Sequence, residues 1–249
     1  MSMTRRQILA LGGGLLACPP AVAFGEASLV DVAELALPDG TVSRPNAWKR
    51  LLYEVIQTTS VECSPRPVLI SPDLPELFEH PFSVLVLDGP FAPLSDVGVE
   101  QLSRYLAYGG FLLIDDTTGA ERGPLDASVR RLIGRLFPTR PLSPLPADHS
   151  VFRSFFLLDK PLGRLARHSW LEGVTVGNVT PLVYMRNDLS GALDRMDDGR
   201  PRQACVPGGE GQRREAIKLG INLILYSLTA NYKRDQAHVR ALMLNGRLE

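Results

Sequence analysis

Polar side chains capable of acid–base chemistry follow three apolar runs of this sequence. They are Asp88 and Gly89 after residues 82–87, Asp115, Asp116 and Thr117 after residues 111–114, and Arg186, Asn187 and Asp188 after residues 182–185. If the runs are parallel strands, their carboxyl ends meet at one edge of the sheet, where open α/β sheets bind ligands. Carboxylates, an amide and a guanidinium gathered there suit general acid–base chemistry, a hard metal ion or a polyol.

His149 could complete such a site, because it follows a proline-rich loop at residues 141–148 that could fold back over this edge. An imidazole beside Asp115 or Asp116 would supply the base and acid of a hydrolase. A structural interpretation competes with this one, because aspartates after strands often cap the next helix or anchor a turn. Likewise, His149 could simply fill a hydrogen-bonding niche. The distance between His149 and the two carboxylates distinguishes these interpretations.

The surrounding sequence predicts alternating strands and helices. Residues 82–87 and 111–114 are continuously apolar, as expected of strands buried on both faces. Between them, Ser95 can cap a helix that ends before Gly109, which gives a right-handed parallel crossover. Further strands are expected within residues 28–37, 67–71 and 170–185, and further helices at residues 45–57, 125–137 and 215–231. The pattern predicts an α/β fold with a mostly parallel central sheet.

Composition limits the functions available to the chain. Its 249 residues are 45% hydrophobic, and 27 Lys and Arg balance 27 Asp and Glu. A net charge of zero provides no global field that would draw the protein to nucleic acid or to an acidic membrane. The sequence lacks a paired-histidine zinc motif, a phosphate-binding glycine loop and a Gly-x-Ser-x-Gly elbow. We therefore expect no cofactor and no metal.

The N-terminus reads as an export signal. Arg5 and Arg6 precede a short apolar run at residues 11–17, which resembles a twin-arginine signal peptide. The run is shorter than the roughly 20 residues that span a bilayer. Ala-Val-Ala at residues 21–23 offers a cleavage site, which predicts a periplasmic protein. The alternative is a membrane-anchored protein, held by an uncleaved signal or by a lipidated Cys18.

This interpretation divides the chain into three parts. They are a signal peptide at residues 1–25, an α/β domain at residues 26–232 and a peripheral tail at residues 233–249. Two cysteines, Cys63 and Cys205, remain after cleavage. An oxidising compartment permits a disulfide, but two buried, unpaired thiols are the favoured expectation for so distant a pair.

Several motifs taken together resemble a family, a bacterial domain of unknown function with the number 4159. They are residues 84–89 (Val-Leu-Val-Leu-Asp-Gly), 109–116 (Gly-Gly-Phe-Leu-Leu-Ile-Asp-Asp), 148–152 (Asp-His-Ser-Val-Phe), 187–189 (Asn-Asp-Leu) and 219–222 (Leu-Gly-Ile-Asn) with Tyr226. The resemblance implies a class I glutamine amidotransferase-like protein with a flavodoxin-like three-layer sandwich. It also implies cell-envelope partners, namely proteins with von Willebrand A domains and a chaperone-like ATPase.

The chain departs from that superfamily at the nucleophile. Glutaminases of this kind place a cysteine after a strand like residues 111–114, where this chain has Asp115 or Asp116. A carboxylate cannot form the thioester, so glutamine hydrolysis by this route is not expected. Backbone amides near Gly89 and Thr117 could still form an oxyanion pocket.

Three functions remain open from the sequence. The first is an exported binding or assembly component of the cell envelope, with a polar crevice lined by Asp88, Asp115, Asp116, His149 and Asp188. The second is an Asp/His-dependent hydrolase that acts on a saccharide or peptide-like envelope polymer. The third is a structural scaffold in which every aspartate serves as a cap.

Overall fold

A seven-stranded sheet organises the protein in the computed structural model, which describes residues 29–244 and the side chains of residues 29–229. The strand order is β2-β1-β3-β4-β7-β6-β5. The strands are β1 (Ala33–Leu35), β2 (Val68–Ile70), β3 (Phe82–Leu87), β4 (Phe111–Asp116), β5 (Ser143–Pro144), β6 (Glu172–Val176) and β7 (Val179–Met185). The first five strands of that order are parallel, and β6 pairs antiparallel with both neighbours. The prediction of a mostly parallel sheet is confirmed.

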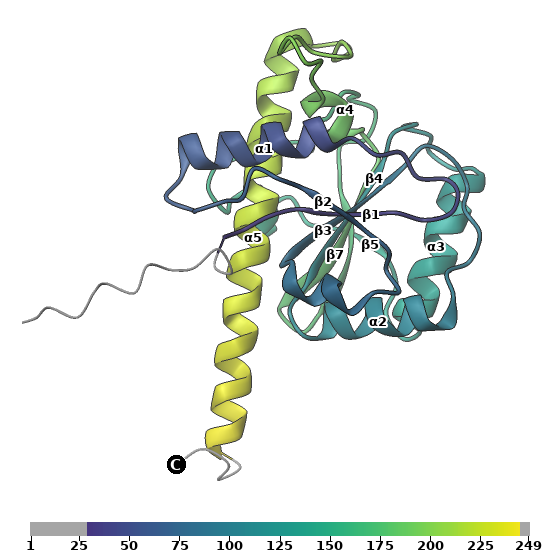
Figure 1. Cartoon of the computed structure of the whole chain (residues 1–249), viewed down its shortest axis with the longest axis vertical. Coiled ribbons are helices and arrows are strands. Elements are labelled where there is room, and N and C mark those ends of the chain that lie inside the picture. Colours follow the sequence, from purple (N-terminus) through teal and green to yellow (C-terminus); the bar gives the residue numbers. More distant parts are fainter. Residues whose placement is uncertain (1–28, 245–249) are drawn as a thin grey trace, which may run out of the picture.

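Helices cover both faces of the sheet (Figure 1). They are α1 (Pro45–Thr58), α2 (Asp96–Ala107), α3 (Pro124–Leu136), α4 (Leu189–Leu193) and α5 (Gly209–Leu244), with short 3-10 helices at Pro75–Glu79 and Ser150–Phe152. One apolar core lies between the sheet and α1, α4 and α5, and a second lies between the sheet and α2 and α3. This is the three-layer sandwich of a flavodoxin-like fold, as predicted.

Local signals explain the central crossover. The hydroxyl of Ser95 accepts the N–H of Gly98 at 2.8 Å and caps α2. After α2, Gly109 adopts a φ of 110°, which glycine tolerates and other residues rarely adopt, and the chain turns into β4. Strands β3 and β4 are buried throughout and pair in parallel. The expected hairpin is also present, with Gly177 between β6 and β7 at a φ of 62°.

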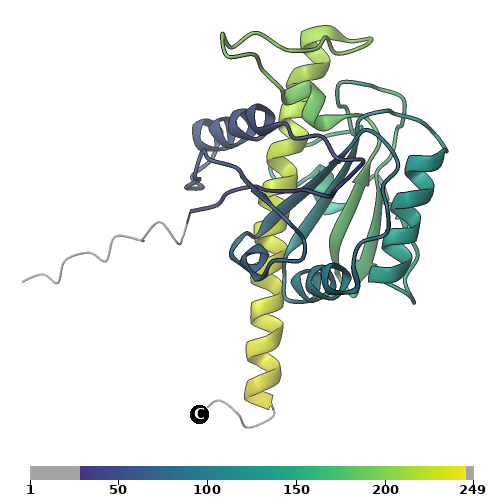
Figure 2. The ribbon, with the colours of Figure 1, turned by 45° about the vertical axis from the view of Figure 1, so that its right-hand side comes forward.

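Three features differ from the expectations. Helix α5 is a single helix from Gly209 to Leu244, longer than the helix expected at residues 215–231. Its last turns project beyond the sheet (Figure 2). Helix α4 was not expected, and the 141–148 loop contains the short strand β5. Among the described helices, none combines the length and hydropathy needed to cross a bilayer. The expected signal peptide and Cys18 lie outside the described residues.

The two described cysteines are free and buried. Cys63 lies beside Val30, at the amino end of β1, and burial raises the pKa of its thiol to about 11. Cys205 lies near Arg164, beyond the carboxyl end of β7. A disulfide requires Cα atoms within about 7 Å of each other, so thiols at opposite edges of the sheet do not pair.

Candidate functional site

Asp115 and Asp116 point to opposite faces of the sheet, as neighbours on a strand must. Asp115 shares the face of Leu113, toward α4, whereas Asp116 shares the face of Ile114, toward α2 and α3. Both side chains are almost completely buried. The two carboxylates therefore lie in different environments and do not form one site.

Asp115 caps helix α4. Its two carboxylate oxygens accept the N–H groups of Leu189 and Ser190, each at 2.8 Å, and these are the first residues of the helix. A carboxylate is favourable at this end of a helix, but the site excludes water. Burial, and next the negative charge of Asp188, raise the pKa of Asp115 to about 6.

Asp188 is the hub of a buried ionic cluster. It adopts a φ of 55° and accepts the N–H of Gly191 at 2.9 Å, so it also caps α4. The guanidinium of Arg44 donates to one carboxylate oxygen at 2.6 Å, and Arg164 donates to the other. Two cations thus compensate one fully buried anion, and the cluster joins the start of α1 to the segment around Arg164.

Asp116 and Thr117 anchor the turn after β4. One oxygen of Asp116 accepts the backbone N–H and the hydroxyl of Thr118, both at 2.7 Å, and the other accepts the hydroxyl of Tyr184 at 3.2 Å. The N–H of Thr117 donates to the carbonyl of Leu87 at 2.9 Å. That amide is therefore engaged in the structure and does not face an oxyanion pocket.

Asn187 fastens a covering loop, residues 160–168, over this edge. Its amide oxygen accepts the N–H groups of Arg167 and His168, and its amide nitrogen donates to the carbonyls of Pro161 and His168. At Gly163 the loop runs so close that an added Cβ would lie 2.1 Å from the carbonyl oxygen of Asn187. The covering loop closes the edge beyond β7.

Arg186 is held in a second ion-pair chain. It pairs with Glu172 at 2.8 Å and donates to the carbonyl of Glu121 at 2.8 Å. Glu172 also pairs with Arg130. This guanidinium is buried, and its two contacts tie the turn after β4 to strand β6.

His149 does not join the carboxylates. Its Nε2 lies 3.0 Å from the hydroxyl of Thr180, and its Nδ1 accepts the N–H of Val151. Thr180 is near the amino end of β7, five residues before Met185, which pairs with Asp115. At about 3.3 Å per residue, His149 is roughly 16 Å from the Asp115 level. Burial lowers its pKa. The expected meeting of His149 with Asp115 and Asp116 is thus corrected.

The remaining predicted residues, Asp88 and Gly89, lie in the loop after β3. Asp88 is exposed, and its N–H donates to the carbonyl of Gly40 at 3.1 Å. The structure therefore brings together Asp115 and Asp188 but leaves no open crevice between them. No group of three or more His, Cys, Asp or Glu side chains in the described part of the chain has metal-binding geometry.

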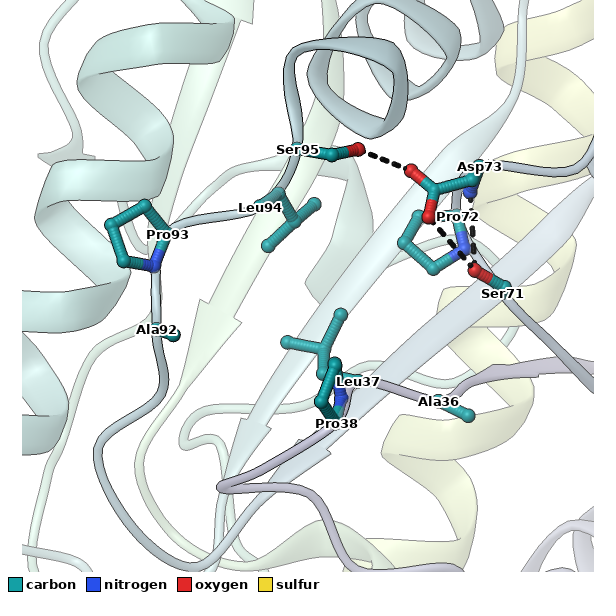
Figure 3. Close-up of a pocket in the computed structure, with 10 residues that line it drawn as sticks. All are labelled: Ala36, Leu37, Pro38, Ser71, Pro72, Asp73, Ala92, Pro93, Leu94 and Ser95. Carbon is teal, nitrogen blue, oxygen red and sulfur yellow. Dashed lines mark hydrogen bonds between the residues drawn. The ribbon is translucent and has the colours of Figure 1, made fainter.

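The hollow at the carboxyl edge lies elsewhere, beyond β1, β2 and β3 (Figure 3). We call it the switch-point hollow, and it has a volume of about 270 Å³. It is lined by Ala36, Leu37, Pro38, Ser71, Pro72, Asp73, Ala92, Pro93, Leu94 and Ser95. From β1 the chain crosses to β2 on one side, and from β3 it crosses to β4 on the other. Doubly wound sheets bind ligands where the strand order reverses in this way.

The polar groups of the switch-point hollow form a small network. The hydroxyl of Ser95 donates to Asp73 at 2.5 Å, and the N–H of Asp73 donates to the hydroxyl of Ser71 at 3.3 Å. The lining includes no histidine, lysine or cysteine. Without an imidazole or a thiol beside the two serines, these groups are suited to holding a ligand rather than cleaving one.

Sequence reasoning missed this hollow because none of its residues forms a motif. The available signal was a proline in each of the three loops that follow β1, β2 and β3, at positions 38, 72 and 93. Prolines stiffen loops, so three loops with fixed shapes meet at one edge.

The strand order and the helices on both faces define a flavodoxin-like α/β protein. Within that class, the chain belongs to the family described as Domain of unknown function (DUF4159), whose model matches residues 31–228. The family resemblance inferred from the motifs is confirmed. Among curated proteins, none matches the chain.

Proposed function

We propose that this protein is an exported, non-glutaminase binding or assembly domain of the cell envelope. Its ligand site is the switch-point hollow, not the aspartates first considered. The observation that carries the proposal is the combination of an open hollow where the strand order reverses with carboxylates that are buried in structural bonds.

The lining indicates the chemistry of the ligand. Seven of its ten residues are Ala, Leu or Pro, and Asp73 is its one charged residue. At about 270 Å³ the hollow is smaller than the roughly 300–1,000 Å³ of sites for drug-sized molecules. It suits one or two side chains of a partner's loop, with an apolar body and an amine or hydroxyl that donates to Asp73.

Export and partners rest on the sequence. The twin-arginine pattern at Arg5 and Arg6 supports a periplasmic location. The family resemblance supports envelope partners with von Willebrand A domains and a chaperone-like ATPase, and it supports kinship with class I glutamine amidotransferase-like proteins. A partner that presents a basic or hydroxyl-bearing loop would match the hollow.

The hydrolase alternative has no geometric support. His149 lies at the other end of the sheet, and both Asp115 and Asp116 are engaged in backbone bonds. We expect Asp116→Asn to lower the melting temperature, because Asp116 anchors its turn.

The proposal is tested by filling the switch-point hollow with a larger side chain. Ala92 lines it, so Ala92→Trp should block binding of a partner, whereas Ala147→Trp places the same side chain at an exposed position outside the lining. Partners are captured from envelope extracts with each variant and measured by calorimetry with the purified partner. The proposal predicts at least a tenfold loss for Ala92→Trp alone. Equal binding by both variants would reject the hollow as the site.

A further inference from the structure

A second groove lies between α1 and the first turns of α5, and it is strongly basic. Its volume is about 440 Å³. It is lined by Arg50, Glu54, Thr58, Phe156, Arg195, Glu210, Arg213, Arg214, Ile217, Lys218 and Ile221. Five cationic side chains face two carboxylates there, in a protein whose net charge is zero. None of these residues belongs to the switch-point hollow, so the groove is a separate feature.

The two carboxylates of the groove already form ion pairs within the protein. Glu54 pairs with Arg50 one turn away on α1, and Glu210 pairs with Arg213 at 2.8 Å. Arg213 also donates to the carbonyls of Ala192 and Gln203, so all three of its nitrogens are already engaged within the protein. The acidic groups of the groove therefore leave part of its positive charge uncompensated.

The uncompensated charge lies on Arg195 and Arg214. Neither forms an ion pair with any residue whose side chain the structure describes. Lys218, the fifth cation, pairs with Glu215 at 2.7 Å and lies 5.7 Å from the ring of Phe156. Two guanidinium groups on different segments thus face the groove with their charge available.

The arginines also carry unsatisfied donors. The Nε atoms of Arg50 and Arg195 are buried and have no hydrogen-bond partner. Leaving such a donor unpaired costs about 1–3 kcal/mol. Burial, and then the charges of Arg50 and Arg213, lower the pKa of Arg195, so the cation is destabilised where it stands. An anion between the guanidinium groups would relieve both the repulsion and the missing bonds.

We infer that this groove binds a phosphoryl group, as a phosphate monoester or as the headgroup of a lipid. Its cations come from α1, from the segment after α4 and from α5, so they surround an anion with oxygens in several directions. Arginine forks match phosphate oxygens. A phosphate dianion can neutralise both guanidinium groups that have no ion pair, whereas a carboxylate carries a single negative charge. Phe156, Ile217 and Ile221 give the groove an apolar wall for the organic part of the ligand.

The test uses the purified protein and inorganic phosphate, with chloride and acetate at matched ionic strength. Phosphate should raise the melting temperature and bind by calorimetry, and Arg195→Gln with Arg214→Gln should weaken binding at least tenfold. Arg66→Gln removes one charge from an exposed residue outside the groove and should leave phosphate binding unchanged. Without phosphate, Arg195→Gln should not lower the melting temperature, because it removes a repelled cation.

A vesicle arm separates the two sources of the phosphoryl group. Cosedimentation with phosphatidylglycerol but not phosphatidylcholine vesicles, lost in the double variant, identifies a lipid headgroup. Phosphate binding without vesicle binding identifies a soluble ester. The inference is overturned if phosphate stabilises no more than acetate does, or if the double variant binds phosphate as the wild type does.

Discussion

Replacing Asp115 by Asn should change how stability depends on pH. In the folded protein, burial and the neighbouring charge of Asp188 raise the Asp115 pKa from 3.8 to about 6. Asp188 has two guanidinium partners and Asp115 has none, so the proton is held by Asp115. Each pKa unit corresponds to about 1.4 kcal/mol, so the rise represents about 3 kcal/mol. Because the unfolded chain is already partly ionised at pH 4, the change in stability between pH 4 and 7.5 is about 2–3 kcal/mol.

The sign follows from linkage. A raised pKa means that the folded state holds the proton more tightly than the unfolded chain does. The contribution of Asp115 to stability is therefore complete below about pH 4, and it is lost as the pH rises through about 6. Above that pH, the wild type carries a buried charge that the Asn variant does not have.

The Asn side chain also changes the cap of α4. It keeps one acceptor oxygen for the N–H groups of Leu189 and Ser190 and loses the other, which costs about 1–2 kcal/mol. At pH 4 the variant should be less stable than the wild type by that amount. At pH 7.5 it should be equal to the wild type or about 1 kcal/mol more stable.

Urea unfolding at a series of pH values measures this difference, and the titration of all other groups cancels between the two proteins. Asp115→Ala is the matched control, because it removes the charge and both acceptors. Its difference from the wild type should follow the same pH trend with a larger constant loss. A difference that stays flat from pH 4 to 7.5 would refute the raised pKa and its cause.

Three further substitutions test the packing and one ionic contact of the protein. Gly163→Ala should destabilise the protein by about 2–3 kcal/mol, because the added Cβ would lie 2.1 Å from a backbone atom. Gly134→Ala in α3 adds a Cβ in open space and should raise the stability by about 0.5–1 kcal/mol. Thermal unfolding measures both differences. His80→Gln removes an imidazolium that Asp31 contacts at 2.8 Å, and that hydrogen bond raises the His80 pKa. The loss in the free energy of unfolding should be about 1 kcal/mol below pH 6.5 and should vanish as the pH rises through the raised pKa. Denaturant titrations at pH 6 and 9 measure it, and equal losses at the two pH values would contradict this trend.

The central crossover could be predicted because local and long-range signals agree there. Residues 82–87 and 111–114 are apolar on both faces, Ser95 caps the helix between them, and Gly109 ends it. Each signal acts within a few residues, and the parallel pairing follows from the crossover itself. The α/β layers can therefore be predicted from the sequence alone.

The ionic cluster around Asp188 could not be predicted in the same way. Its partners Arg44 and Arg164 lie 144 and 24 residues away in the chain. Nothing in their spacing distinguishes them from other arginines. The structural role of the strand-end aspartates was foreseen as a class, but the pairing depends on where loops land after folding.

The position of His149 could not be predicted from the sequence either. The loop was expected to fold back over the carboxyl edge, but its apolar residues decide its course. Leu145, Val151 and Phe152 enter the core beneath α5, which leads the chain across the face of the sheet. His149 then reaches Thr180 rather than Asp115. Burying these apolar side chains outweighs any single polar contact that the imidazole could make at the edge.

The location of the switch-point hollow follows from topology rather than from any residue pattern. A hollow forms where two adjacent strands send their chains to opposite sides of the sheet, and here these strands are β1 and β3. Strand β1 has only three residues, so periodicity cannot show that it lies between β2 and β3. Once that order is known, the three proline-bearing loops must converge, and a binding role needs no catalytic motif. The reversal point persists whatever residue follows β4, so the hollow does not depend on the identity of Asp115 or Asp116.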